Sequence, residues 1–379
     1  MMRETVSRRI PLCEPLLGGN EKSYLDECLA TNFVSSVGPF VDRFERHFAE
    51  FVQAPHAVAT CNGTAAIHTA LRLVDAGPGD AVLVSTFTFI ASVNPIRYLG
   101  ADPVFIDSDA TWNMDPSLLE EGIRAAQAAG KRVAAILAVH LYGEPADISP
   151  IVALAGRHGI PVIEDAAESL GAFVSGRSVG TFGRLGCFSF NGNKVITSGA
   201  GGMIVTADEA IARRAKHLTT QARVPGGEYF HDEVGFNYRL TNLQAAVGLA
   251  QLEQLPHFLD RKRQIAARYD EAFRGVDGLS RPATIHDGVS ASWLYSIAVD
   301  PDTFGIDRRA LAARLAGHRI EARPLWTPVH TFPPYAGSAA VLTGQADRLF
   351  AQGLSLPCSV SLTPHDQDYV IDAVLSARR

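Results

Sequence analysis

Between Cys187 and Lys194 the chain reads Cys-Phe-Ser-Phe-Asn-Gly-Asn-Lys, and this stretch decides how the rest of the sequence is interpreted. The alternating residues 187–190 predict a short buried strand, and residues 191–193 form a turn that presents Lys194. A primary amine at the exit of a buried strand is suited to form a Schiff base with an aldehyde cofactor. A solvated loop lysine is the competing interpretation, so other segments have to decide between the two.

Short apolar runs before and after this stretch alternate with segments of helical pattern. The apolar runs are residues 56–60, 81–85, 103–107, 133–139, 160–164, 187–190 and 203–206. The helical segments among them are residues 65–74, 91–98, 116–129 and 150–158. This alternation predicts an α/β fold in which helices flank a mainly parallel sheet. Ligands of such a sheet bind beyond the carboxyl ends of its strands, which is where Lys194 would lie.

Further helices are predicted before this core. A helical pattern covers residues 21–29, and the next helix carries Phe40, Phe44, Phe48 and Phe51 on one stripe. We interpret this stripe as facing the hydrophobic core.

A smaller C-terminal domain is predicted after the core. A helix or helix pair, broken near Pro256, covers residues 241–274, and residues 293–299 alternate as a strand. We therefore divide the chain into a large cofactor-binding domain with an N-terminal arm, residues 1–255, and a small α+β domain, residues 256–379.

An anion site is predicted where the first strand meets the first helix. Asn62-Gly63-Thr64 precedes the helix that begins at Ala65, so N–H groups of the helix N-terminus lie beside a glycine and a hydroxyl. A phosphate group fits such a site, although glycine turns before helices are also common without a ligand. At the end of the next strand, Phe89 is placed either to stack on a flat cofactor ring or simply to pack.

Three carboxylates lie at or just after the end of another buried strand, in the run from Val162 to Glu168. Burial of a carboxylate is unfavourable without a cationic partner. Asp165 is therefore predicted to face a cation such as a pyridinium nitrogen, or else to cap the following helix. Together the strand ends offer a phosphate cradle, a stacking ring, an acid for a ring nitrogen and a lysine for an aldehyde. Pyridoxal 5'-phosphate needs these four partners, so we predict it as the cofactor.

The composition indicates a globular protein without a nucleic-acid or membrane partner. The chain has 379 residues, 47% of them apolar, and a formal net charge of -6, which offers no electrostatic basis for binding nucleic acid. No apolar run approaches the roughly 20 residues that span a bilayer, and the charged N-terminus does not resemble a secretory signal. The five cysteines are scattered and form no Cys-x-x-Cys pair, which predicts neither disulfides nor a zinc site and indicates a reducing, cytoplasmic location.

Four segments resemble the signatures of the DegT/DnrJ/EryC1/StrS family of sugar aminotransferases: residues 62–66, 162–169, 188–194 and 235–242. The resemblance extends from about Ile10 to Ser359. It implies the type I aminotransferase fold, pyridoxal 5'-phosphate as the cofactor, and a homodimer whose active sites are shared between the two subunits.

The resemblance also implies the roles of the residues around the cofactor ring. Lys194 would bind the cofactor aldehyde and act as catalytic base and acid, and Asp165 would pair with the pyridine nitrogen. Glu168, where relatives often have Gln or His, would lie near the ring hydroxyl, and Phe89 would stack on the ring.

Four further residues are implied to hold the cofactor phosphate. Gly63, Thr64 and Ser189 would bind it within one subunit, and Asn237 would reach it from the other subunit.

Five residues are candidates for contact with the substrates. Asn191 and Asn193 lie directly before the lysine. Arg323 is suited to receive a donor carboxylate or a sugar diphosphate, although a surface or dimer salt bridge is an equal alternative. Trp326 and His330 are candidates for the sugar pocket, with simple packing as the alternative for each.

The implied reaction is an exchange in which L-glutamate loads the cofactor and a nucleotide-linked 4-keto-6-deoxy sugar takes the amine. Residues 32–38, 111–116 and 323–330, with residues 191–193 before the lysine, are most similar to the branch that acts on UDP-linked 4-keto-6-deoxy-N-acetylglucosamine in bacillosamine and legionaminic acid synthesis. GDP-perosamine synthases, which act on GDP-4-keto-6-deoxymannose, are the nearest alternative. Some relatives are sugar dehydratases with histidine in place of the lysine, so Lys194 favours transamination.

Overall fold

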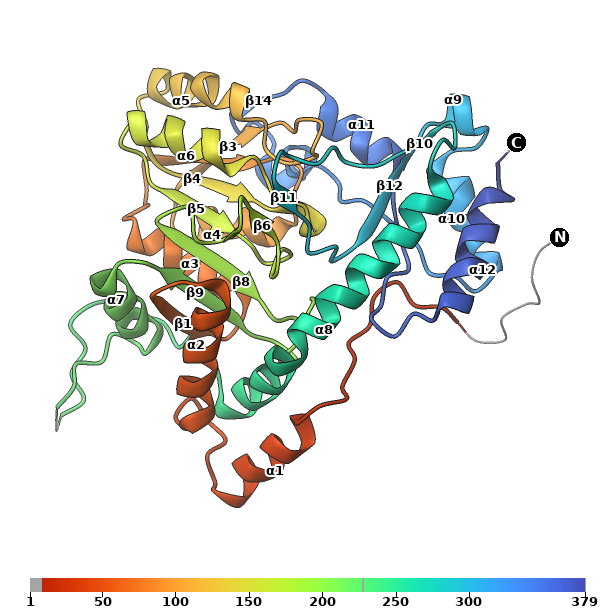
Figure 1. Ribbon diagram of the computed structural model, residues 1–379. Helices are drawn as coiled ribbons and strands as arrows, with labels where there is room; N and C mark the ends of the chain where they lie inside the picture. Colours follow the sequence, from red (N-terminus) through yellow and green to blue (C-terminus); the bar gives the residue numbers. More distant parts are fainter. Residues whose placement is uncertain (1–8, 227, 379) are drawn as a thin grey trace.

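The core of the protein is an eight-stranded sheet, which the computed structural model describes together with the rest of residues 9–226 and 228–378 (Figure 1). Across the sheet the strands follow the order β1 (His56–Thr60), β9 (Gly202–Thr206), β8 (Leu185–Ser189), β5 (Val162–Asp165), β4 (Arg132–Val139), β2 (Asp80–Ser85), β3 (Asp102–Ile106) and β14 (Ala340–Val341). Strand β9 pairs antiparallel with β1 and β8, and the pairs from β8 to β14 are parallel. The predicted α/β fold with a mainly parallel sheet is therefore confirmed.

Side chains alternate between the two faces of this sheet along each strand, so both faces carry apolar side chains. Helices cover both faces (Figure 1). In β2, Ala81 and Leu83 belong to one core cluster, whereas Val82 and Val84 belong to another. The first cluster includes residues of α2 (Pro39–Val52), α5 (Leu119–Ala128), α6 (Ile148–Arg157) and α8 (Asn242–Phe273). The second includes residues of α3 (Gly63–Leu73), α4 (Asn94–Tyr98) and α7 (Glu209–Thr219).

Helix α2 is held to the sheet by the aromatic stripe seen in the sequence. Phe40, Phe44 and Phe48 are fully buried. The ring centroids of Phe44 and Phe190 are 5.0 Å apart, as are those of Phe48 and Phe188. The stripe faces the core as predicted, and it anchors the strand that leads to Lys194.

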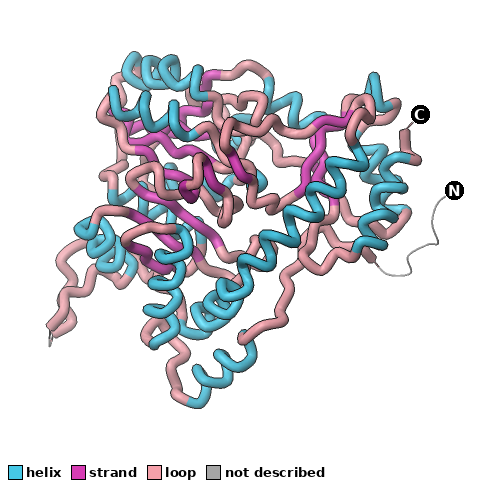
Figure 2. The backbone as a smooth tube through the Cα atoms, in the orientation of Figure 1, coloured by secondary structure: helices cyan, strands magenta, loops and turns pink. Residues whose placement is uncertain are grey.

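Helix α8 is one continuous helix of 32 residues, so the predicted break near Pro256 is wrong (Figure 2). A proline inside a helix removes one backbone hydrogen bond and costs about 3 kcal/mol. Packing offsets this cost, because Leu252, Leu255, Phe258 and Leu259 on either side of the exposed proline are buried. The helix therefore extends from the large sheet to the C-terminal part of the chain (Figure 1).

A second sheet lies near the C-terminal end of α8. Its strand order is β10 (Leu279–Ser280), β12 (Tyr295–Val299), β15 (Gly353–Leu356) and β13 (Arg323–Pro324). The helices of this region are α9 (Pro301–Phe304), α10 (Arg308–Gly317), α11 (Gln345–Gln352) and α12 (Pro364–Leu375). The domain division at residue 256, which falls within α8, stays a prediction.

Segments from the N-terminal and C-terminal parts of the chain connect the large sheet, helix α8 and the C-terminal region. Strand β14 returns to the large sheet and pairs with β3. Helix α1 (Glu21–Ala30) packs against α8. In the N-terminal arm, Ile10 bridges Ile320, and the Leu12 carbonyl accepts a 2.8 Å hydrogen bond from Cys358 N.

Short elements complete the fold. A three-stranded sheet has the order β11 (Gly288–Val289), β6 (Phe173–Val174) and β7 (Arg177–Ser178). The 3-10 helices are η1 (Ile90–Ser92), η2 (Pro116–Leu118), η3 (Leu141–Gly143), η4 (Val329–Thr331) and η5 (Pro333–Tyr335). Among the described residues, no helix is long and apolar enough to cross a membrane.

Candidate active site

A cavity of about 480 Å³ lies beyond the carboxyl ends of β5 and β8, at the N-terminus of α3. Eleven of the residues predicted from the sequence line it: Gly63, Thr64, Phe89, Asp165, Glu168, Ser189, Asn191, Asn193, Lys194, Arg323 and Trp326. Asn237 and His330 are not among its lining residues. The cavity is at the end of the sheet where ligands of parallel α/β folds bind.

Asp165 is the last residue of β5, and its carboxylate is buried in the wall of the cavity. One oxygen accepts a hydrogen bond from Ser92 Oγ at 2.7 Å, and the other accepts one from Ala167 N at 3.1 Å. Burial raises the pKa of Asp165, against the opposing influence of these donors. Two donors leave the carboxylate able to accept a further hydrogen bond from a cationic group in the cavity.

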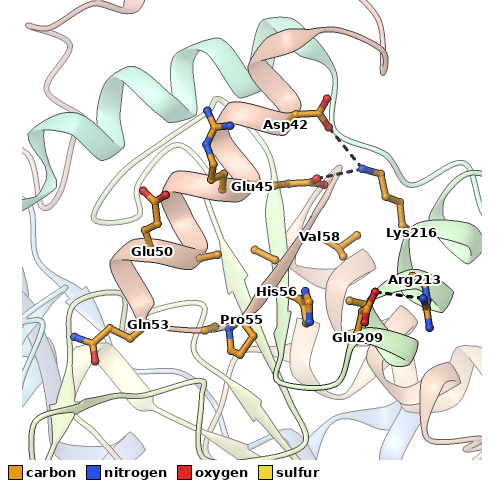
Figure 3. Close-up of a pocket in the computed structure, with 15 residues that line it drawn as sticks. Asp42, Glu45, Glu50, Gln53, Pro55, His56, Val58, Glu209, Arg213 and Lys216 are labelled. Carbon is orange, nitrogen blue, oxygen red and sulfur yellow. Dashed lines mark hydrogen bonds and ion pairs between the residues drawn. The ribbon is translucent and has the colours of Figure 1, made fainter.

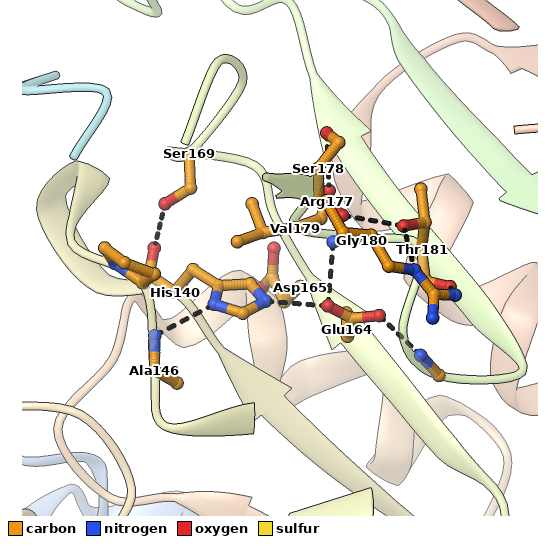
Figure 4. A network of polar contacts seen from close by, with 12 residues as sticks. His140, Ala146, Glu164, Asp165, Ser169, Arg177, Ser178, Val179, Gly180 and Thr181 are labelled. Carbon is orange, nitrogen blue, oxygen red and sulfur yellow. Dashed lines mark hydrogen bonds and ion pairs between the residues drawn. The ribbon is translucent and has the colours of Figure 1, made fainter. Parts of the chain in front are cut away.

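A buried network fixes the backbone around Asp165 (Figure 4). His140 N donates to the Asp165 carbonyl at 3.0 Å, and His140 Nδ1 accepts from Ala146 N at 3.0 Å. The proton of the ring is therefore on Nε2, which lies 3.0 Å from Glu164 Oε2. Glu164 also accepts from Gly180 N at 2.7 Å, so this neighbouring acid is fully engaged away from the cavity.

Lys194 reaches the cavity from the loop after β8, as the turn in the sequence predicted. Its N–H donates to the Asn191 carbonyl at 3.0 Å, which closes the turn. Its Nζ lies 3.1 Å from Glu168 Oε1 and 3.8 Å from the centroid of the Trp293 ring. The amine is thus held between a carboxylate and an aromatic face.

Glu168 is the second acid of the site. Its Oε2 accepts a hydrogen bond from Tyr142 N at 2.8 Å, while Oε1 faces Lys194. Burial raises the pKa of Glu168 to about 7, although the nearby lysine acts in the opposite direction. The side chain therefore changes its charge within the physiological range of pH.

The N-terminus of α3 lies against the end of β8. Asn62 caps this helix by accepting from Ala65 N at 2.8 Å. A Cβ atom at Gly63 would lie only 2.8 Å from Cβ of Ser189, so glycine is needed for this close approach. The result is a cradle of helix N–H groups and the hydroxyls of Thr64 and Ser189, which suits a phosphate.

Four aromatic residues, Phe89, Tyr142, Trp293 and Trp326, also line the cavity. The ring centroids of Phe89 and Trp326 are 5.3 Å apart, and those of Tyr142 and Trp326 are 4.7 Å apart. Trp293 follows at 6.3 Å from Tyr142. Ser92, Tyr142 and Trp293 line the cavity as well, but no local sequence motif identifies them as residues of the site.

Three of the residues predicted for the site contact neighbouring side chains of their own chain. Asn237 Oδ1 accepts a 2.9 Å hydrogen bond from Gln221, and His330 Nδ1 lies 2.7 Å from Thr86 Oγ1. Arg323 lines the cavity but pairs with Glu321 at 2.9 Å.

A larger surface hollow of about 790 Å³ lies between α2, β1 and α7 (Figure 3). Lys216 there pairs with Glu45 at 3.5 Å and Asp42 at 3.6 Å, and Arg213 pairs with Glu209 at 3.2 Å. These charges compensate one another at the protein surface. The 480 Å³ cavity instead brings a buried acid, an amine and an anion cradle together, so it is the candidate active site.

The donor set of this cavity fits pyridoxal 5'-phosphate. The cradle at Gly63 suits the phosphate, the buried carboxylate of Asp165 suits a protonated ring nitrogen, and the amine of Lys194 suits the aldehyde. The three groups come from different elements but open into the same space.

Comparisons with known proteins agree with this donor set. The model of the DegT/DnrJ/EryC1/StrS aminotransferase family matches residues 15–375. EpsN of Bacillus subtilis, named as a pyridoxal phosphate-dependent aminotransferase, is 44% identical over 97% of this chain and 95% of its own. A GDP-perosamine synthase of Caulobacter vibrioides is 40% identical over 97% of each chain. The solved structure of the aminotransferase TlmJ from Streptoalloteichus hindustanus superposes with a TM-score of 0.90 at 31% identity, covering 97% of this chain and 98% of that one.

Proposed function

The chain belongs to the DegT/DnrJ/EryC1/StrS aminotransferase family and is a pyridoxal phosphate-dependent sugar aminotransferase, and from this premise we propose that it moves the amino group of L-glutamate to C4 of a nucleotide-linked 4-keto-6-deoxy sugar. One observation carries the proposal: Lys194, Asp165 and the N-terminus of α3 open into a single cavity. The scattered cysteines support a reducing, cytoplasmic location for the reaction.

Asp165 is proposed to hold the ring nitrogen of the cofactor in its protonated form. When bound, pyridoxal phosphate supplies an electron-withdrawing ring that stabilises negative charge on the reacting carbon atom. The buried Asp165 carboxylate, oriented by Ser92 at 2.7 Å, keeps the proton on the ring nitrogen by charge and by hydrogen bonding.

Lys194 is proposed to have two roles. Its Nζ would hold the cofactor through the aldehyde group, and as a free amine it would hold and move the proton at the reacting carbon as general base and acid. Glu168 lies 3.1 Å from Nζ and is placed to keep the released amine in position. Glu168 would also lie near the ring hydroxyl, and Phe89 would stack on the ring.

The phosphate is proposed to be bound by residues of both subunits of a homodimer. Gly63, Thr64 and Ser189 would bind it from one side. Asn237 is outside the cavity of its own chain and lies in an isolated bridge with Thr220. This position supports the assignment in which Asn237 of the partner subunit completes the phosphate site.

We propose UDP-linked 4-keto-6-deoxy-N-acetylglucosamine as the sugar substrate. The support is the similarity of residues 32–38, 111–116 and 323–330 to that branch of the family. Within the cavity, Asn191, Asn193, Arg323 and Trp326 are the proposed substrate contacts. His330, which does not line the cavity and lies 2.7 Å from Thr86 Oγ1, is the fifth proposed contact.

GDP-4-keto-6-deoxymannose is the second candidate substrate. The observation in its favour is the 40% identity to proteins named GDP-perosamine synthase, over 97% of this chain for the one from Caulobacter. Turnover with L-glutamate should be compared for UDP-, GDP- and TDP-linked 4-keto-6-deoxy sugars. The highest kcat/KM with the UDP sugar supports the first proposal, and the highest value with the GDP sugar supports the second. If 2-oxoglutarate does not form with any of them, the proposed reaction with L-glutamate is contradicted, and a sugar dehydratase becomes the alternative to test.

The role of Lys194 is tested by the visible spectrum. The purified protein is expected to be yellow, to lose this absorption on borohydride reduction, and to retain the cofactor covalently afterwards. Lys194→Ala should be colourless as isolated. A wild-type protein that stays colourless after addition of pyridoxal phosphate contradicts the assignment of the whole site.

A further inference from the structure

A buried lysine and two cysteines meet where the N-terminal arm, α8 and the end of β15 come together. Lys262 is 2% exposed, and its Nζ donates to the Trp293 carbonyl at 2.7 Å and to the Cys358 carbonyl at 2.9 Å. An ammonium group has three protons to donate. The remaining one faces two sulfur atoms, because Cys13 Sγ lies 3.6 Å and Cys358 Sγ 3.8 Å from Nζ.

The charge of Lys262 needs a counter-charge, because burial of an unpaired ammonium is strongly unfavourable. Among the residues that the structure describes, no carboxylate forms a salt bridge with it. The negative partner within reach is therefore a thiolate. Cys13 is the better candidate, since a hydrogen bond from the Cys358 thiol, together with the charge of Lys262, lowers the pKa of Cys13 to about 6.

Other charged groups around Cys13 do not change its assignment as the thiolate that pairs with Lys262. Lys194, on the loop after β8, adds to the stabilisation of the thiolate. Glu14, next in the chain, turns its carboxylate to Ser361 Oγ at 3.3 Å. In its thiol form, Cys13 Sγ donates a hydrogen bond to the Asn193 carbonyl at 3.4 Å, so the cluster touches the loop that carries Lys194.

The backbone places the two cysteines side by side. Cys358 N donates to the Leu12 carbonyl at 2.8 Å, and Glu14 N donates to Ser359 Oγ at 3.0 Å. Cys13 therefore lies directly against Cys358, and both sulfurs converge on Lys262. Cys13 is half-buried, whereas Cys358 is 2% exposed, so Cys13 is the more accessible residue of the pair.

We propose that Cys13 and Cys358, held by Lys262, are a redox-active thiol pair that hydrogen peroxide converts to a disulfide. The Cys13 thiolate first attacks one oxygen of the peroxide: an S–O bond forms, the O–O bond breaks and hydroxide leaves. The Cys358 thiol then attacks the Cys13 sulfur: the S–S bond forms, the S–O bond breaks, and hydroxide leaves with the thiol proton as water. The two sulfurs lose two electrons, and the peroxide oxygens accept them.

The product is identified by peptide mapping of the holoenzyme after brief peroxide treatment. Trypsin releases Cys13 in residues 10–22 and Cys358 in residues 349–378, and neither peptide contains another cysteine. We expect these two peptides to be crosslinked without reductant and to separate after treatment with dithiothreitol. Oxidation that stops at Cys13, or a crosslink of Cys13 to Lys262, overturns the proposal.

The activation of Cys13 is tested by alkylation of the native protein with iodoacetamide across a range of pH. Cys61 is the matched control, because it is also half-buried but burial raises its pKa. We expect the rate for Cys13 to level off above about pH 6 and to exceed that of Cys61 roughly tenfold at pH 7. Equal rates and parallel pH profiles for the two cysteines contradict the role of Lys262.

Two variants separate the steps. Lys262→Met should reduce the advantage of Cys13 over Cys61, because it removes the charge of Lys262 but keeps the contact with Cys358. Cys358→Ser should leave oxidised Cys13 without a partner thiol, so that a dimedone adduct forms on Cys13 after peroxide treatment. If Lys262→Met does not fold, the wild-type pH profile and the peptide map decide the question without it.

Discussion

Glu168 is the acidic residue of the site that faces the amine of Lys194, at 3.1 Å. Its folded-state pKa of about 7 lies above the ordinary value of 4.5, so the folded protein binds this proton more tightly than the unfolded chain does. The corresponding stability is fully present below pH 4.5 and is lost as the pH rises through 7.

The change Glu168→Gln tests this linkage. As the pH rises from about 4.5 to 7, the free energy of unfolding of the cofactor-free wild type should fall by on the order of 3 kcal/mol relative to the variant, which has no titrating group there. Urea unfolding at a series of pH values measures the difference. Stability curves that run parallel over this range would show that Glu168 keeps an ordinary pKa.

Asp165→Asn is expected to lower kcat roughly 10²- to 10³-fold, because a neutral amide cannot hold the proton on the cofactor ring. The cofactor should remain bound through Lys194 and the phosphate cradle, so the visible absorption should persist. Steady-state kinetics with the preferred sugar, combined with the spectrum, distinguish this outcome from simple loss of the cofactor. Full activity in a coloured variant is incompatible with the proposed role.

At the scale of elements, the contact between the first turn of α3 and the end of β8 forms the proposed phosphate cradle. A Cβ atom at Gly63 would lie 2.8 Å from Cβ of Ser189, at the point where the N-terminus of α3 packs against the end of β8. The sequence motif marks the glycine, and the packing of α3 against β8 explains it.

Gly63→Ala should therefore weaken binding of pyridoxal phosphate about 10- to 100-fold, which corresponds to the roughly 1–3 kcal/mol cost of overpacking. Fluorescence or absorbance titration of the cofactor-free protein measures this. Gly156→Ala in α6 is the matched control: open space surrounds that position, so cofactor affinity should stay unchanged and stability should rise slightly. A wild-type dissociation constant for Gly63→Ala would place the phosphate elsewhere.

At the scale of the whole molecule, the proposed homodimer shares its sites. Lys194 and Asn237 would come from different subunits in each site, because Asn237 lies outside the cavity of its own chain. A mixed dimer of Lys194→Ala and Asn237→Ala subunits tests this arrangement, since one of its sites would combine wild-type Lys194 with wild-type Asn237.

Such a mixed dimer, prepared with two affinity tags, should bind one cofactor covalently with wild-type affinity. The Asn237→Ala homodimer should bind it roughly 10- to 100-fold more weakly, the expected loss for a hydrogen bond to a charged group. Titration of the wild-type, Asn237→Ala and mixed dimers with the cofactor measures the three affinities. If the mixed dimer is as weak as the Asn237→Ala homodimer, Asn237 acts within its own subunit.

Much of the fold was predictable because it follows from local patterns. The strand and helix alternation, the aromatic stripe of α2 and the placement of Asp165 and Lys194 after buried strands all depend on residues close in sequence. The break predicted at Pro256 failed because the intrinsic cost of a proline is a local quantity. Burial of Leu252 and Phe258 against distant parts of the chain outweighs that cost.

The sequence by itself therefore determined the α/β core, the cofactor and the amine that we propose to bind it, because these depend on short periodic runs and turns. The tertiary structure alone decided what surrounds that amine. Glu168 opposite Lys194, the wall formed by Tyr142 and Trp293, and the meeting of Cys13 with Cys358 bring together residues far apart in the chain. Such contacts depend on how whole elements pack, and no local spacing of residues encodes them.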